Sequence, residues 1–195
     1  MMSQDQSLMD RLENRFGVAA HHEAAPKKVW AKKVPAGIHP RFKGMQEVRI
    51  AAVGDAGPEH ALIEVWDTKD SVMAWKTGIL VPGEQLQHVL GALLKAEEVE
   101  ADLVLTPKEH RPVFPIVVDE VPGSMGLIKV ILDEYNDRIQ VKLSHSIHGR
   151  RSGGGWLSVG VEDIQPIGSM LLKVLKSIPA ADGAPADSAE VELPF

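Results

Sequence analysis

The chain has 195 residues, of which 44% are hydrophobic, and a formal net charge of -6 at pH 7. This length fits one large domain or two small ones, and the apolar content is enough to build a core. The absence of cysteine excludes a disulfide framework, a thiolate zinc site and a cysteine nucleophile, and the lack of an apolar run of roughly 18 residues or an apolar signal region predicts a cytoplasmic protein without membrane association.

The first half of the chain contains alternating apolar patterns followed by an amphipathic one. Residues 1–25 read as a flexible or partly helical lead-in, and the basic segment 27–44 is interrupted by Pro and Gly and holds at most one short strand. Alternation in 46–53 and 61–66 predicts a hairpin, and 71–77 with 78–81 predicts two more short strands. The apolar spacing in 82–98 then predicts a helix that opens at Pro82 and Gly83.

The second half repeats this order of elements. Strand patterns at 126–132, 139–146 and 156–159 precede a helix pattern at 162–178. A shift of 78 residues places Glu84 on Glu162 and Leu93 on Leu171, while the strands keep their parity. Two amphipathic helices could share a Leu-Leu-Lys sequence by chance, but one offset that fits strands, turns and helix together favours duplication.

We therefore predict an α+β fold made of two ββββα repeats, with curved antiparallel sheets and packed helices that form a pseudo-dimer. The expected divisions are a lead-in at 1–25, a basic segment with the first repeat at 26–97, a linker at 98–121, the second repeat at 122–179 and a disordered acidic tail at 180–195.

This order of elements resembles the single-stranded nucleic-acid-binding fold shared by the positive-cofactor-four coactivators, the Whirly proteins and the Pur-alpha repeats. The most specific likeness is the strand that runs into the helix, "KTGILVPGEQLQHVLGALLKA", in which Lys76 and Gly78 match the lysine-glycine-isoleucine-serine-leucine strand of the cofactor module. The second copy has Gly154 and Trp156 there and lacks this lysine. The resemblance covers about residues 46–178 and implies binding to single-stranded DNA, with RNA as a further candidate ligand.

The end of the chain, "EVELPF", resembles the acidic C-terminal peptide of bacterial single-stranded-DNA-binding proteins, which recruits replication and repair enzymes. Such proteins carry that peptide after an OB-fold domain, whereas no OB-fold is expected here. The resemblance implies a docking peptide for replication or repair proteins, as in a bacteriophage replication protein; a polar tail that finishes on Phe by chance is the alternative. The expected docking residues are Glu190, Glu192, Leu193, Pro194 and Phe195.

Charge and aromatic residues are distributed as a single-strand binder requires, with cations for phosphates and flat rings for bases. Residues 26–49 hold seven Lys or Arg against one Glu, and residues 138–176 hold six against two acidic residues. Phe42 lies between two cations, whereas Trp66 reads as a core aromatic. The expected nucleic-acid-binding residues are Lys28, Trp30, Lys32, Lys33, Arg41, Lys43, Trp75, Lys76, Lys142, Arg150, Arg151 and Trp156.

Catalytic patterns are sparse, so we expect neither an enzyme nor a cofactor or metal. His145 and His148 have no nearby carboxylate cluster in the sequence, and the loop "GRRSGGG" lacks the Lys-Ser/Thr end and the following helix of a phosphate-binding loop. The sequence thus favours a sequence-tolerant single-stranded DNA-binding protein that acts in replication, recombination or repair. A homo-oligomer is compatible with this interpretation. The alternative is a transcriptional cofactor or structural interaction module with weak or no nucleic-acid binding.

Overall fold

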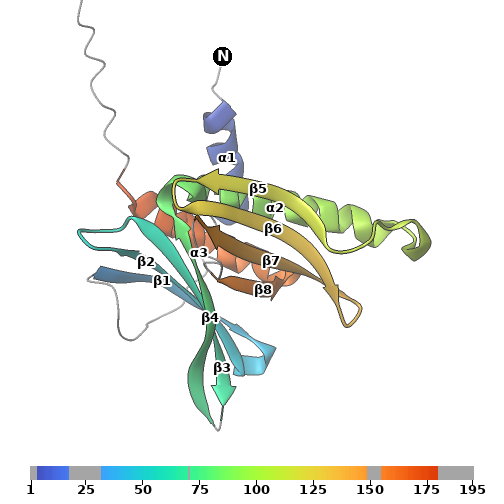
Figure 1. The fold of residues 1–195 in the computed structure, drawn as a ribbon, viewed down its shortest axis with the longest axis horizontal. Coiled ribbons are helices and arrows are strands. Elements are labelled where there is room, and N and C mark those ends of the chain that lie inside the picture. Colours follow the sequence, from blue (N-terminus) through green and yellow to red (C-terminus); the bar gives the residue numbers. More distant parts are fainter. Residues whose placement is uncertain (1–3, 18–31, 70, 149–154, 180–195) are drawn as a thin grey trace, which may run out of the picture.

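The computed structural model describes residues 4–17, 32–69, 71–148 and 155–179, and these form two four-stranded antiparallel sheets, each followed by a helix (Figure 1). The first sheet has the order β1 (Lys32–Arg41), β2 (Gln46–Gly54), β3 (His60–Lys69) and β4 (Val72–Pro82), and leads into α2 (Gly83–Leu105). The second has the order β5 (Ile116–Gly123), β6 (Gly126–Tyr135), β7 (Arg138–Ile147) and β8 (Trp156–Gly160), and leads through a short 3-10 turn into α3 (Ile164–Ser177). The predicted α+β fold with two ββββα units is confirmed.

Several strand and linker boundaries differ from the sequence expectations. Residues 72–82 form one continuous strand, β4, where two short strands were expected. A bulge at Lys76 shifts the register, and β4 pairs with β3 on both sides of this bulge. The expected linker at 98–121 contains the last turns of α2 and the first residues of β5. The second unit therefore begins at Ile116, and its first strand spans the expected boundary at 122.

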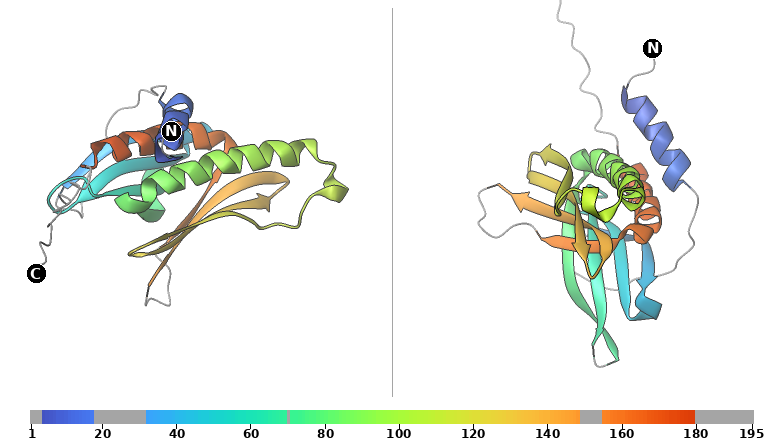
Figure 2. Two further views of the ribbon diagram at one scale, coloured as in Figure 1. Left: turned by 90° about the horizontal axis from the view of Figure 1, so that it is seen from above. Right: turned by 90° about the vertical axis from the view of Figure 1, so that its right-hand side faces the viewer.

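The two helices are exchanged between the sheets. Helix α2 packs on β5 and β6, and α3 packs on β1 and β2, so each helix covers the sheet of the other unit (Figure 2). The helices also contact each other, and buried residues of both units form one apolar cluster. Because each sheet has its apolar face covered by the other unit's helix, the two units make a single folded body.

The first part of the lead-in is a packed helix, α1 (Gln4–Phe16), which lies across α2 and α3. Leu12 and Phe16 are fully buried, and Ser169 Oγ donates a hydrogen bond to the Phe16 carbonyl oxygen at 2.6 Å. Arg15 pairs with Glu97 of α2. Residues 4–16 therefore belong to the folded body. The expectation of a flexible or partly helical lead-in allowed for this helix but not for its packing on the core.

None of the helices in the described ranges is long and apolar enough to cross a membrane.

Candidate nucleic-acid interface

The two sheets meet where β4 lies against β7 and β8. Thr77 Oγ1 of β4 donates a hydrogen bond to the Trp156 carbonyl oxygen at 2.7 Å. Gly155 has φ of 107° and sits so close to the Gly78 carbonyl that a Cβ at residue 155 would overlap it. Only glycine satisfies both demands, because L side chains avoid this φ and need the space. This contact fixes the position of β8 next to β4.

A groove of about 480 Å³ opens beside this contact, and we call it the junction groove. Both units line it, with Arg41, Phe42, Gln46, Val65, Lys76 and Thr77 from the first and Asp133, Tyr135, Gln140, Lys142, Trp156 and Ser158 from the second. Three of these side chains are cationic and one is a carboxylate, which gives 3 - 1 = +2. Two of these cations also pair with carboxylates behind the lining, Arg41 with Asp163 and Lys76 with Asp67, so Lys142 is the lining cation for which the described residues show no ion pair.

Three aromatic rings of the junction groove are open to solvent. Exposed fractions are 53% for Phe42, 65% for Tyr135 and 55% for Trp156. Arg41 lies over the Phe42 ring at 4.8 Å from its centroid, and the Lys142 ammonium lies 5.3 Å from the Trp156 centroid. Large exposed aromatics are unusual on a surface without a ligand. Rings paired with cations are the combination that stacks bases and attracts phosphates.

A chain of polar contacts forms one wall of the junction groove. Arg41 Nη1 donates to Gln46 Oε1 at 2.7 Å, and Gln46 Nε2 donates to Asp67 Oδ1 at 2.6 Å. Arg41 Nε also pairs with Asp163 of the second unit at 2.6 Å, and Lys76 Nζ pairs with Asp67 at 2.6 Å. Hydrogen bonds from Lys76 and then Gln46 lower the pKa of Asp67. Arg41 is thus buried and held in place by Asp163, whereas Lys76 is half-exposed and paired with Asp67.

The structure brings some of the expected binding residues together and separates others. Arg41, Lys76, Lys142 and Trp156 line the junction groove, and Lys43 is exposed in the 3-10 turn that carries Phe42. Lys32 donates to the Ala56 carbonyl oxygen, and Lys33 pairs with Glu64 at 2.8 Å. These two lysines therefore lie outside the groove.

Two tryptophans are arranged differently from the sequence expectation. Trp75 lies on the opposite face of β4 from Thr77, where its cross-strand partner is Trp66 of β3. The interpretation of Trp66 as a core aromatic is wrong, because it occupies the non-core phase of β3 and Arg49 lies over its ring. Its neighbours in the alternating pattern, Ile63 and Val65, are the buried ones.

The remaining expected site residues lie outside the described ranges. They are Lys28, Trp30, Arg150 and Arg151 of the nucleic-acid set, and Glu190, Glu192, Leu193, Pro194 and Phe195 of the docking set. Their roles stay predictions.

Sequence reasoning missed several residues of the junction groove, namely Gln46, Val65, Thr77, Asp133, Tyr135, Gln140 and Ser158. For the four in the second unit a signal was present in the period-two pattern, since they alternate with the buried Leu132, Val141 and Leu157. That pattern marks an outward face, but it does not indicate which outward face lies next to another unit.

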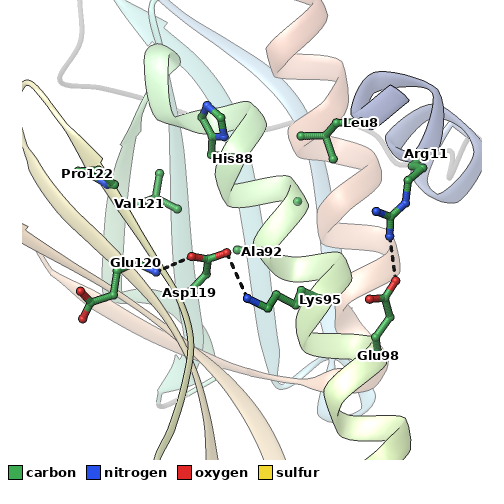
Figure 3. Close-up of a pocket in the computed structure, with 11 residues that line it drawn as sticks. Leu8, Arg11, His88, Ala92, Lys95, Glu98, Asp119, Glu120, Val121 and Pro122 are labelled. Atoms are coloured by element: carbon green, nitrogen blue, oxygen red, sulfur yellow. Dashed lines mark hydrogen bonds and ion pairs between the residues drawn. The ribbon is translucent and has the colours of Figure 1, made fainter. Parts of the chain in front are cut away.

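A second hollow of about 590 Å³ lies between α1, α2 and β5 (Figure 3). Arg11 pairs with Glu98 at 2.9 Å and Lys95 with Asp119 at 3.7 Å. With Glu120 the lining carries two cations and three carboxylates, which gives 2 - 3 = -1 with His88 neutral. This hollow is therefore a poorer match for phosphate than the junction groove. Among the described residues no group of three His, Asp or Glu could hold a metal ion.

No family model matches this chain, and no curated protein sequence matches it. The functional argument consequently depends on the geometry and chemistry of the junction groove.

Proposed function

We propose that the protein binds single-stranded DNA in the junction groove and acts in replication, recombination or repair. The observation that carries the proposal is the set of three exposed aromatic rings beside cations in one groove. A duplex hides the faces of its bases in the stack, whereas a single strand offers them to aromatic side chains. The resemblance to the positive-cofactor-four, Whirly and Pur-alpha fold supports the same ligand class.

The chemistry of the groove favours sequence-tolerant binding. Every base has a π-face, so stacking on Phe42, Tyr135 and Trp156 discriminates little among bases. The groove offers few free groups for reading base edges, because Ser158 Oγ donates to Gln140 Oε1 and Gln46 is bonded on both sides. Lys142 supplies charge for a phosphate, whereas Lys76 can do so only by leaving Asp67. Counterion release then makes the affinity depend on salt.

A protein-interaction module, such as a transcriptional cofactor, is the second candidate function. The observation that favours it is a group of exposed apolar side chains at and beyond the end of α2, where Val104, Leu105 and Val113 are all solvent-accessible. Exposed apolar groups of this kind can dock a protein partner. This function predicts little or no binding to an oligonucleotide, so one titration separates the two candidates.

The test is a titration of fluorescently labelled oligo-dT and oligo-U with the full chain. Trp156→Ala should weaken binding about 5- to 150-fold, since one base stack is worth about 1 to 3 kcal/mol, and Trp156→Phe should restore much of it. Lys142→Ala should reduce the slope of log affinity against log salt by about 0.7 if it meets one phosphate. Lys176→Ala is the matched control, because this half-exposed lysine pairs with Glu13 on α1, away from the groove.

Absence of binding to either oligonucleotide at low salt would refute the proposal and favour the interaction module. Unchanged affinity in the folded Trp156→Ala and Lys142→Ala variants would remove the junction groove as the site.

A further inference from the structure

The outer face of the first sheet, which points away from the helices, carries a second aromatic cluster. Trp66 of β3 and Trp75 of β4 are direct cross-strand partners, and Trp75 is 58% exposed. Opposing side chains in an antiparallel pair lie close enough to interact. The two indoles therefore lie on the same face of the sheet, with Trp66 half-buried and Trp75 open to solvent.

A clamped arginine supports this cluster from β2. The Arg49 guanidinium lies 4.3 Å from the centre of the Trp66 ring, and its Nε donates a hydrogen bond to Glu47 Oε2 at 2.8 Å. A cation over an indole face gains energy from the ring quadrupole and fixes the ring in place. Trp66 Nε1 is buried and has no hydrogen-bond partner within the described ranges, so stacking and packing alone orient this ring.

Gly78 leaves room beside the exposed indole. A Cβ at residue 78 would be 3.1 Å from the Ile63 carbonyl oxygen of the neighbouring strand, 3.5 Å from Trp75 Nε1 and 3.6 Å from Glu64 Cγ. Any larger side chain would therefore extend across the edge of the Trp75 ring. Glycine weakens a strand interior and often marks a close approach of a ligand or another backbone. We call Arg49, Trp66, Trp75 and Gly78 the outer platform.

The outer platform and the junction groove are two faces of the same edge strand. β4 is the last strand of its sheet, and its bulge places Trp75 opposite Trp66 while Thr77 stays opposite Val65. Lys76 and Thr77 consequently line the groove, and Trp75, the preceding residue, faces the other way. Only the thickness of one strand separates the two sites, with the Lys76 ammonium at the rim.

We propose that a single strand longer than the junction groove passes over the edge of β4 and stacks a further unpaired base on Trp75 of the outer platform. This inference rests on the proposed function and extends the binding track to a second face. The cations near the platform are already neutralised, since Arg49 pairs with Glu47 and Lys33 with Glu64. The platform therefore holds a base by stacking and adds no phosphate contact.

The test compares a short oligo-dT of about 6 nucleotides with a long one of about 20, because single-strand modules commonly occupy 4 to 16 nucleotides. Trp75→Ala should weaken binding of the long strand about 5- to 150-fold, the value of one stacked base, and leave the short strand unchanged. The salt slope should stay the same, and Trp75→Phe should recover most of the loss. Trp156→Ala is the matched groove variant and should weaken both strands.

Three results would overturn the inference. If folded Trp75→Ala binds both lengths like the wild type while Trp156→Ala weakens both, the platform is not part of the track and the groove proposal stands. If Trp75→Ala weakens the short strand equally, Trp75 serves the groove or the fold, which a shift in thermal midpoint would reveal. If the wild type binds neither length, the proposed function fails and the platform site fails with it.

Discussion

The packing of α1 against α3 can be tested with two substitutions. The effect of one on the free energy of unfolding should change sign when the other is present. Gly168 of α3 faces the buried Phe16 ring so closely that a Cβ at residue 168 would overlap the ring atoms Cδ1 and Cε1. Gly168→Ala therefore forces a collision in the wild-type protein. In a Phe16→Ala background the same methyl group would enter the space that the ring leaves.

The expected free energies follow from three separate effects. Phe16→Ala removes a fully buried ring and should cost about 3 to 5 kcal/mol of unfolding free energy. Gly168→Ala gains about 1 kcal/mol of helix propensity, but overpacking costs about 1 to 3 kcal/mol, so alone it should be neutral or destabilising by up to about 2 kcal/mol. In the Phe16→Ala background it should instead stabilise by about 1 kcal/mol, which gives a coupling of about 1 to 3 kcal/mol.

Urea unfolding followed by circular dichroism on the wild type, both single variants and the double variant measures this coupling. Gly91→Ala is the matched control, because its Cβ would lie 3.4 Å from Leu8 Cδ1 of α1, an ordinary contact distance, and should give only the propensity gain. Additive effects of the two substitutions would mean that Phe16 and Gly168 do not meet in solution, which would refute the packing of α1 on α3.

Two further predictions concern the pH dependence of stability and the acidic tail. Burial lowers the pKa of His145, and the Leu80 backbone offsets only part of this effect. In the unfolded state His145 has an ordinary pKa of about 6.5 and binds the proton more tightly than in the folded state. The thermal midpoint should therefore be highest above pH 6.5 and should fall as the pH drops from there through the folded pKa. His145→Phe should flatten that fall, and a wild-type midpoint that is constant from neutral pH to pH 5 would contradict the reasoning. Deletion of residues 187–195 should leave affinity for oligo-dT intact but abolish capture of a replication or repair protein; loss of DNA binding would mean that the segment belongs to the fold.

The sequence predicted the inner strands well because their side chains are buried on one face only. β3 and β7 alternate buried and outward residues, and their bounds differ by the expected 78 residues, since 60 + 78 = 138 and 69 + 78 = 147. The first strands of the two sheets, β1 and β5, were not recognised at their full length. β1 contains Pro35, Gly37 and Pro40, residues that an edge strand tolerates because one of its sides has no partner.

The exchange of helices could not be predicted from the sequence. An apolar stripe on a helix shows that one face is buried, but it does not indicate which sheet covers that face. The two helices share the same Leu-Leu-Lys sequence at Leu93 and Leu171, so local pattern could not assign them to different sheets. The choice depends on tertiary contacts such as that of Gln85, which donates from α2 to the Val121 carbonyl oxygen in β5 at 2.7 Å.

The candidate site shows the same limit for charged residues. Arg41 and Lys33 stand in a basic run, which favours a phosphate contact, yet each has a carboxylate partner that is distant in the sequence. Asp163 lies 122 positions after Arg41, and Glu64 lies 31 positions after Lys33. A run of basic residues therefore predicts the sign of a surface, whereas the pairing that decides which cation is available depends on the fold.

The duplication has a consequence for how a strand would lie in the junction groove. Two identical units related by a twofold axis would present a groove that looks the same from either end. Here the first unit supplies two cations and one ring, Arg41, Lys76 and Phe42, while the second supplies one cation and two rings, Lys142, Tyr135 and Trp156. The two sides of the groove are thus similar in kind but not equivalent. Because a nucleic-acid strand has a direction, with base and phosphate offset along its backbone, such an asymmetric groove favours one polarity of the bound strand. Fusion of the two copies in one chain permits this divergence, which a homodimer of one unit could not achieve.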